Sequence, residues 1–225
     1  MATRGKKYKN AVKAKSHDAV SILEGIKHVK KSTYSSFTGS AELHLVINLP
    51  KDKDAKSVKG SVTLPHGEKK EVKIAVFSTP ENVKLALTAG ATKAGLEDLM
   101  KEVQSGKIDF DVAIATPDVM PKIAVLGKVL GPKGIMPNPK TGTVTTDVEK
   151  TIKAYLGGKM DFKADAQGGI HLSAGKLSLD DDKLIENINA LLKSVEEAYG
   201  KGLITLVKDA YLAPTMGKSI RVRVE

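Results

Sequence analysis

Three groups of residues have types that could carry catalytic or metal chemistry, and each falls short of the spacing that the chemistry requires. Gly217-Lys218-Ser219 is similar to the end of a phosphate-binding loop, but that motif needs a glycine where Leu212 stands. The acidic run Asp180–Asp182 is explained by the start of a helix, whose dipole favours negative charge. The five histidines, at positions 17, 28, 44, 66 and 171, show no metal-ligand spacing.

Other enzyme patterns are also missing from the sequence. No G-x-G-x-x-G follows an apolar strand, and no nucleophile, base and orienting group can be assembled. His44 lies in an alternating stretch, where a lone histidine is more often a hydrogen-bonded structural residue than a ligand. The sequence therefore predicts no enzyme, no cofactor and no resident metal. A nucleotide-binding enzyme that uses the middle of the chain is kept as an alternative.

The charge balance favours a partner that carries phosphate. The 225 residues include 36 Lys and Arg against 26 Asp and Glu, which gives a formal net charge of +10. Only 4% of the residues are aromatic, so base stacking on a sheet of exposed rings is not expected. Nearly all the cations are lysines, which contact phosphate as point charges. This composition suits recognition of a folded RNA by its shape and backbone, and a nonspecific RNA chaperone is a further alternative.

Several cellular settings are disfavoured by composition. The sequence has no cysteine, so disulfides and thiolate metal sites are excluded and a reducing compartment is expected. No apolar run approaches the length of about 20 residues that a membrane span needs. The basic start, residues 1–15, lacks the apolar segment of a signal peptide and is interpreted as a mobile or RNA-ordered arm. These features predict a cytoplasmic protein without membrane contact.

Hydrophobic periodicity places similar elements at the two ends of the chain. Residues 41–49 alternate with the apolar side chains at odd positions, which predicts a half-buried strand with Glu42, His44 and Asn48 on its other face. The other expected elements are a helix over 16–31 capped by Ser16, a strand over 58–64, a hairpin over 160–172, a helix over 178–200, and strands over 203–212 and 219–224.

The middle of the chain has a different texture, with short apolar strands between helices. Strands are predicted over 72–77 and 111–116, and helices over 80–90, 95–104, 118–129 and 147–156. This alternation indicates an α/β unit with a mostly parallel sheet. The apolar faces at the two ends of the chain need each other as partners. We therefore predict a split domain, residues 1–67 plus 159–225, with an inserted domain over residues 68–158.

The segment GPKGIMPNPKTGTV, residues 131–144, contains three prolines, three glycines and two lysines but no acid. Proline fixes φ and lacks an N–H group, and glycine weakens regular elements, so neither a helix nor a strand is expected there. From residue 119 to 146 the chain has four lysines and no acid. We interpret the segment as a stiff basic loop that presents lysines and free backbone N–H groups to a phosphate backbone.

The same fourteen residues closely resemble the signature of the ribosomal protein L1 family, in its bacterial type. Ala115–Met120, Leu64–Gly67 and Thr215–Gly217 are also similar to family segments, in the family's order. The resemblance covers nearly the whole chain. It implies a split two-layer α/β domain made by both termini and an inserted three-layer, Rossmann-like α/β domain.

The resemblance also implies a function and a set of RNA-binding residues. The implied function is that of a structural protein of the large ribosomal subunit that binds a folded stalk region of its rRNA, assists release of exit-site tRNA and represses its own messenger. Outside the ribosome it would be monomeric. The implied RNA-binding residues are Phe37, Ser40, Glu42, Gln167, Gly168, His171, Thr215, Met216 and Gly217, with Lys133 and Lys140 from the basic loop.

The sequence departs from the family pattern near two of these segments. Gly39 stands where the family usually has an acidic or polar residue. Ala213-Pro214 replaces the usual pair of Ser or Thr residues before Thr-Met-Gly. Both departures bear on the side-chain detail of the implied site.

Overall fold

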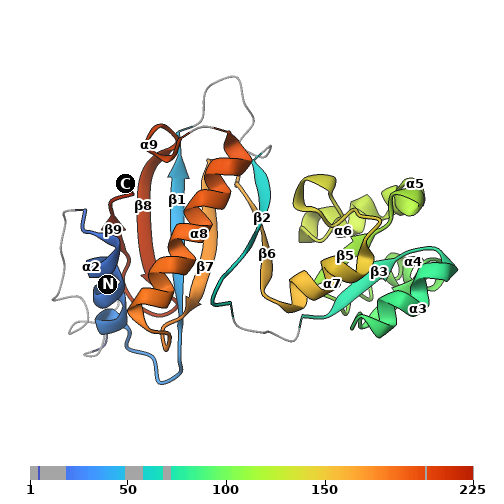
Figure 1. The fold of residues 1–225 in the computed structure, drawn as a ribbon, viewed down its shortest axis with the longest axis horizontal. Coiled ribbons are helices and arrows are strands. Elements are labelled where there is room, and N and C mark those ends of the chain that lie inside the picture. The colour runs from blue at the N-terminus through green and yellow to red at the C-terminus, as the bar shows by residue number, and fades with distance from the viewer. Residues whose placement is uncertain (1–4, 6–18, 49–57, 68–71, 201, 225) are drawn as a thin grey trace. The chain divides into compact units, whose positions relative to one another are not determined.

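The computed structural model describes residue 5 and residues 19–48, 58–67, 72–200 and 202–224. The chain divides into two compact units, residues 1–68 with 160–225 and residues 69–159, here called the terminal unit and the inserted unit (Figure 1). Helices and several sheets confirm the predicted α/β class. That the two units fold as independent domains with the predicted boundaries stays a prediction.

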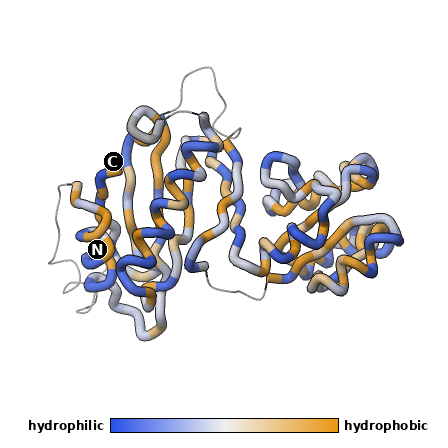
Figure 2. Tube along the Cα trace, viewed as in Figure 1, coloured by the Kyte–Doolittle hydropathy of each residue, from blue (hydrophilic) through white to orange (hydrophobic). Residues whose placement is uncertain are grey.

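The terminal unit is built on a four-stranded antiparallel sheet with the strand order β7-β1-β8-β9. In β1 (Ser40–Ile47) every second residue is buried, from Ala41 to Ile47, as the sequence pattern predicts. The other strands are β7 (Gly169–Lys176), β8 (Val207–Pro214) and β9 (Ile220–Val222). Figure 2 shows hydrophilic and apolar residues succeeding one another along these elements.

Two helices, α2 (Ile22–Ser32) and α8 (Asp181–Tyr199), lie on the same face of this sheet (Figure 1). Their apolar sides join the inward residues of the strands in one core. Ser21 caps α2 through a capping box with Glu24, which fixes where the helix begins. The predicted cap Ser16 lies outside the described residues, and the prediction of helix is wrong for residues 19–21, which precede α2. Gly200, with φ 72°, ends α8 as predicted.

Two predicted elements near the sheet are wrong. The hairpin over 160–172 does not form, because β6 (Lys159–Lys163) pairs with β2 (Lys59–Thr63) while β7 pairs with β1. The strand over 203–212 begins with a short helix, α9 (Leu203–Leu206), before β8. The strand partners of β6 and β7 are distant in the sequence, so the local pattern does not reveal them.

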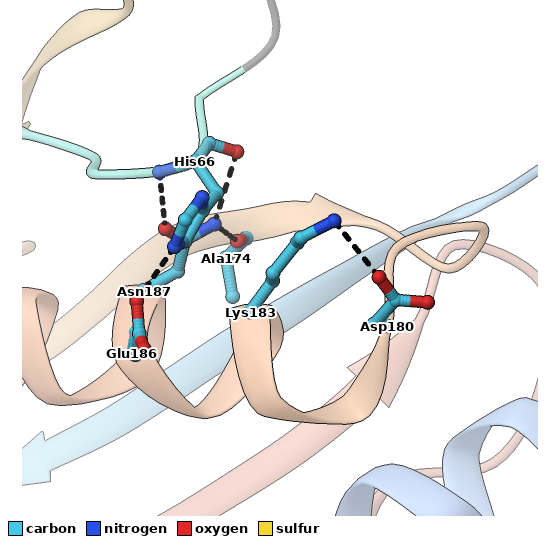
Figure 3. Close-up of polar contacts among 6 residues, drawn as sticks. All are labelled: His66, Ala174, Asp180, Lys183, Glu186 and Asn187. Atoms are coloured by element: carbon cyan, nitrogen blue, oxygen red, sulfur yellow. Dashed lines mark hydrogen bonds and ion pairs between the residues drawn. The ribbon is translucent and has the colours of Figure 1, made fainter.

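The turn after β2 is hydrogen-bonded to Asn187, a buried asparagine of α8 (Figure 3). The Asn187 Oδ1 atom accepts from the His66 backbone N–H at 2.9 Å. The Asn187 Nδ2 group donates to the Ala174 carbonyl at 2.8 Å and to the His66 carbonyl at 3.3 Å. The His66 ring contacts Glu186 at 2.6 Å. Since Asn187 is fully buried, these bonds satisfy a side chain that would otherwise oppose folding.

The inserted unit contains a three-stranded parallel sheet with the order β4-β3-β5. Strand β3 (Ile74–Phe77) is buried at every residue, with Ala75 and Phe77 packing in one cluster and Ile74 and Val76 in another. Helices α3 (Pro80–Thr88) and α7 (Val148–Leu156) contribute to the second cluster. Helices α4 (Glu97–Gln104), α5 (Met120–Ile123) and α6 (Gly127–Lys133) contribute to the first. The sheet therefore has helices on both faces.

Three local predictions for the inserted unit need correction. Strand β4 (Lys93–Gly95) was not expected, because it is short and polar. Residues 118–129 form two short α-helices and two 3₁₀ turns instead of one helix. Strand β5 (Val112–Ala115) precedes them. The basic segment is partly helical: residues 131–133 are the last turn of α6, and Pro139–Thr141 form a 3₁₀ turn. Pro132 lies inside α6, where it cannot donate a backbone hydrogen bond to the preceding turn, and Gly134, with φ 76°, ends the helix two residues later.

Across the described ranges, no helix is long and apolar enough to cross a bilayer.

Candidate nucleic-acid interface

The sheet of the terminal unit has a polar face opposite to the face that α2 and α8 cover. Its residues are at the half-buried and exposed positions of each strand. Across the strands His44 is opposite His171 and Tyr211, and Tyr211 is opposite Arg221. Glu42 is opposite Ser173 and Ala213. We call these residues, with Ser40 and Asp209, the polar sheet face.

The turn that follows β8 is tied to the start of β1 by one hydroxyl group. The Thr215 Oγ1 atom accepts from the Ser40 backbone N–H at 2.9 Å and lies 3.4 Å from a Glu42 carboxylate oxygen. The Thr215 backbone N–H donates to the Ser40 carbonyl at 3.1 Å. Three predicted site residues, Ser40, Glu42 and Thr215, are thus brought together, although Ser40 and Thr215 are 175 positions apart in the chain. The hydroxyl and carboxylate are both able to accept from an RNA 2′-hydroxyl or base amino group.

Predicted residues Phe37, Met216 and Gly217 also lie near this end of the sheet. Phe37 and Met216 are 55% and 43% exposed. A Cβ atom at Gly217 would lie 2.4 Å from Pro214 Cγ and 3.0 Å from the Ser32 carbonyl oxygen. The turn can therefore adopt this path only with glycine there. At Gly39, by contrast, a Cβ would meet only ordinary contacts, the nearest at 3.5 Å.

Gln167, Gly168 and His171 belong to the turn before β7 and to β7 itself. The Asp165 carboxylate accepts from the backbone N–H groups of Gly169 at 2.7 Å and Gln167 at 2.8 Å. These bonds lower the pKa of Asp165, so that carboxylate stays ionised. The Gly168 carbonyl accepts from the Ile47 N–H at 2.9 Å, which fixes the turn beside the end of β1. The Gln167 and Gly168 side of the site thus lies at the opposite end of β1 from Thr215.

The structure adds a residue that the sequence argument treated as structural. The Nδ1 atoms of His44 and His171 are 2.9 Å apart, and the rings meet edge to face with centroids 5.0 Å apart. Burial lowers the pKa of His44 and His171 lowers it further, while Glu42 acts in the opposite direction. The alternating position of His44 was visible in the sequence. Its partner depends on the register between β1 and β7, which the sequence does not reveal.

Acidic side chains are more numerous on this face than a basic protein would suggest. Glu42 and Asp165 each lie within 4 Å of a histidine nitrogen, at 3.8 Å and 3.9 Å. Asp209 forms an ion pair with Arg221. The carboxylates of this region therefore offer hydrogen-bond acceptors, and Asp209 is engaged with Arg221. Among the described residues no group of three or more His, Asp or Glu is placed to hold a metal ion.

The basic loop, residues 131–144, belongs to the inserted unit and holds its own shape. Asn138 accepts from the Lys140 N–H at 2.9 Å, and the Asn138 N–H donates to the buried Thr143 hydroxyl at 2.7 Å. Further backbone N–H groups that bond within the loop or to α6 belong to Gly134, Ile135, Thr141, Gly142 and Thr143. The expectation of free N–H groups is therefore wrong for these residues. Lys133 and Lys140 are both exposed, as the RNA-binding prediction requires.

The sequence from residue 27 to residue 218 matches the Ribosomal protein L1p/L10e family. Because the match spans most of the chain, the chain belongs to that family, whose members are structural ribosomal proteins and not enzymes. This overturns the alternative of a nucleotide-binding enzyme. At the level of the family, the chain is a protein of the large ribosomal subunit that binds rRNA.

Proposed function

We propose that the chain binds a folded stalk region of large-subunit rRNA through the turn at Thr215–Gly217 and the adjacent polar sheet face. The observation that carries this proposal is the Thr215 hydroxyl, held at 2.9 Å by the Ser40 N–H next to the Glu42 carboxylate. A fixed hydroxyl and carboxylate form a rigid acceptor pair. Such a pair favours RNA that presents a 2′-hydroxyl or amino group at one defined position.

The exposed side chains of Phe37 and Met216 support the same assignment. Both are more than 40% exposed, and both lie in segments that adjoin the acceptor pair. An apolar surface beside polar acceptors suits an unstacked base or the sugar edge of a folded RNA. Gly217 fixes the path of this turn, because a Cβ atom there would clash with Pro214 and with the Ser32 carbonyl.

The basic loop has a different role in this proposal. Lys133 and Lys140 are exposed on a segment whose shape is fixed by internal hydrogen bonds, so little ordering entropy is lost when they meet phosphate. Lysines on such a loop add affinity without reading sequence. We therefore assign specificity to the terminal unit and electrostatic attraction to the inserted unit.

Two further roles belong to the same proposal, release of exit-site tRNA and repression of the chain's own messenger in the cytoplasm. The resemblance of the basic loop and of Thr215–Gly217 to the L1 family supports both. Repression would use the same acceptor pair on a messenger segment that mimics the rRNA site. Ribosomes that lack the chain should release deacylated tRNA more slowly, and Thr215→Val should abolish repression of a reporter that carries the messenger's own leader.

Competition between two RNAs tests the central assignment. A labelled transcript of the large-subunit stalk region is bound by the chain, and then displaced either by unlabelled stalk RNA or by an unrelated folded RNA of equal length. We expect displacement by the stalk RNA at concentrations at least about a hundredfold lower, as specific nucleic-acid complexes require. Equal displacement by both RNAs would instead identify a nonspecific RNA chaperone.

A further inference from the structure

The His44–His171 contact has a hydrogen-bond pattern that a neutral pair leaves incomplete. Two Nδ1 atoms at 2.9 Å must share a proton, so one ring donates and the other accepts. In the neutral pair the donating ring then has an unprotonated Nε2 atom. A carboxylate is near that nitrogen in either case, since the His44 Nε2 lies 3.8 Å from Glu42 and the His171 Nε2 lies 3.9 Å from Asp165.

One added proton completes the pattern. It binds the bare Nε2 atom and converts a lone pair near a carboxylate into an N–H group near that carboxylate. Each Nε2 atom then carries a proton within 4 Å of a carboxylate, at ion-pair distance and beyond hydrogen-bond distance. Burial and mutual repulsion oppose this step in the free protein, because they lower the pKa of His44. The histidine pair can thus take up one proton, and the lowered pKa of His44 opposes this uptake in the free protein.

Among the described residues that strand register and ion pairs place beside the pair, the cation is Arg221. The ionisable groups that face the pair are Glu42 on β1, Asp165 before β7, Tyr211 and Asp209 on β8, and Arg221 on β9. Arg221 is already paired with Asp209. With both histidines neutral, this part of the polar sheet face has more negative than positive charge. An RNA phosphate approaching it therefore gains most from protonation of the histidine pair.

The pair lies within the area that a bound RNA would cover. His44 is four residues along β1 from Ser40, which the Thr215 hydroxyl holds. At about 3.3 Å per residue, Ser40 is about 13 Å from His44 along the strand, while the Glu42 carboxylate of the acceptor pair lies 3.8 Å from the His44 Nε2 atom. A folded RNA seated on the turn would extend over this distance, since its contacts span several nucleotides.

We propose that the His44–His171 pair is a proton-dependent contact for the phosphate backbone of the bound RNA. This inference rests on the proposed RNA site and adds a regulation to it, because RNA and a proton then bind together. The linkage has a definite sign. A phosphate raises the pKa of the pair in the complex above its value in the free protein, so affinity increases as the pH falls and is lost as the pH rises through the pKa of the complex.

The test measures affinity for the stalk transcript at about pH 6 and about pH 8, over a series of salt concentrations. It compares the full-length chain with His44→Gln, His171→Gln and His171→Lys. The matched control is His66→Gln, which removes a histidine that contacts Glu186 on α8, away from the polar sheet face. Isothermal titration in buffers of different ionisation enthalpy reports proton uptake on binding. Thermal unfolding of each variant confirms that it is folded.

The unsubstituted chain and His66→Gln should bind about threefold to tenfold more tightly at the lower pH, with a salt slope steeper by about one. Both glutamine variants should lose this difference and the proton uptake. His171→Lys should bind equally well at both pH values. Any pH dependence shared by all variants comes from the RNA and is subtracted.

A glutamine variant that keeps the full pH dependence and proton uptake would overturn the inference. An unsubstituted chain whose affinity does not change with pH would do the same. Neither result touches the proposed function, which is judged by preference for stalk RNA over unrelated RNA at the higher pH. Loss of that preference would refute the proposed function instead.

Discussion

The turn at Thr215–Gly217 and the basic loop at 131–144 are both tight, glycine-containing segments, yet they are held in opposite ways. The hydrogen bond from Ser40 to Thr215 joins residues 175 positions apart. The side-chain bonds of Asn138 and Thr143 span at most five positions. The turn is therefore held by contacts across the terminal unit, whereas the loop combines short-range bonds of its own with bonds from Ala115 and Lys159 to its carbonyl groups. Their charges differ as well, with carboxylates near the turn and lysines without acids in the loop.

This difference suggests a division of labour. A surface that accepts hydrogen bonds at fixed positions discriminates between RNAs, because a wrong RNA leaves buried polar groups unpaired. A surface of exposed lysines attracts all RNAs through counterion release. The first kind of surface needs tertiary structure to set its geometry, and the second needs only a stable loop.

The largest effect should come from filling the space at Gly217. In Gly217→Ala the new methyl would lie 2.4 Å from Pro214 Cγ and 3.0 Å from the Ser32 backbone oxygen. We expect a loss of about 2–3 kcal/mol in the free energy of unfolding, measured by urea titration. Binding of stalk RNA should fall with it, because the turn must move. A variant with unchanged stability would show that the turn is pliable, and the rigid acceptor pair would have to be abandoned.

The next effect tests the hydroxyl itself. Thr215→Val keeps the shape and removes the acceptor for the Ser40 N–H, so stalk RNA affinity should fall by about 1–3 kcal/mol. Thr215→Ser retains the hydroxyl and is the control, expected to bind nearly as well as the unsubstituted chain. Affinity for unrelated RNA should change little in either variant. An equal loss on both RNAs would mean that the turn does not discriminate.

A smaller, different effect is expected from the loop. Lys133→Ala together with Lys140→Ala should weaken binding of stalk and unrelated RNA alike and reduce the salt slope by about one to two. Lys101→Ala with Lys107→Ala makes the same charge change at other exposed positions of the inserted unit and should leave the slope unaltered. If the slope did not respond to the loop substitutions, the loop would have no phosphate contact.

The smallest effect should come from a glycine of the loop. Gly134 has φ 76° and no atom within 4 Å of a new Cβ, so Gly134→Ala suffers backbone strain without a clash. Thermal or urea unfolding should show a loss of about 1 kcal/mol. Preference for stalk RNA should be unchanged. A large loss of preference here would contradict the assignment of specificity to the terminal unit.

The parts of the fold that were predictable from the sequence are those set by short-range patterns. Strand β1 follows from the alternation of Ala41, Leu43 and Leu45, and α3 follows from Pro80 at its first turn. The hairpin over 160–172 failed because the partners of β6 and β7 are chosen by segments more than a hundred residues away. The 3₁₀ breaks between residues 117 and 126 have no comparable local pattern.

The candidate site shows the same contrast between residues found from the sequence and contacts that depend on distant segments. Thr215, Ser40 and Glu42 were named by family resemblance, and their mutual contacts came only from the structure. His44 and Asp165 were missed, because their roles depend on the pairing of β1 with β7 and on the backbone of a turn. Lys133 and Lys140 were found from the loop alone, although its N–H groups are mostly used internally.

The most direct test of the central claim joins residues 1–67 to residues 159–225 and omits the inserted unit. Circular dichroism and urea unfolding establish whether this chain folds, and competition between stalk and unrelated RNA measures its specificity. The account predicts a cooperatively folded protein that keeps the full chain's preference for stalk RNA, with weaker affinity and a lower salt slope. A folded protein without that preference, or an unfolded one, would contradict the claim that the terminal unit alone carries recognition.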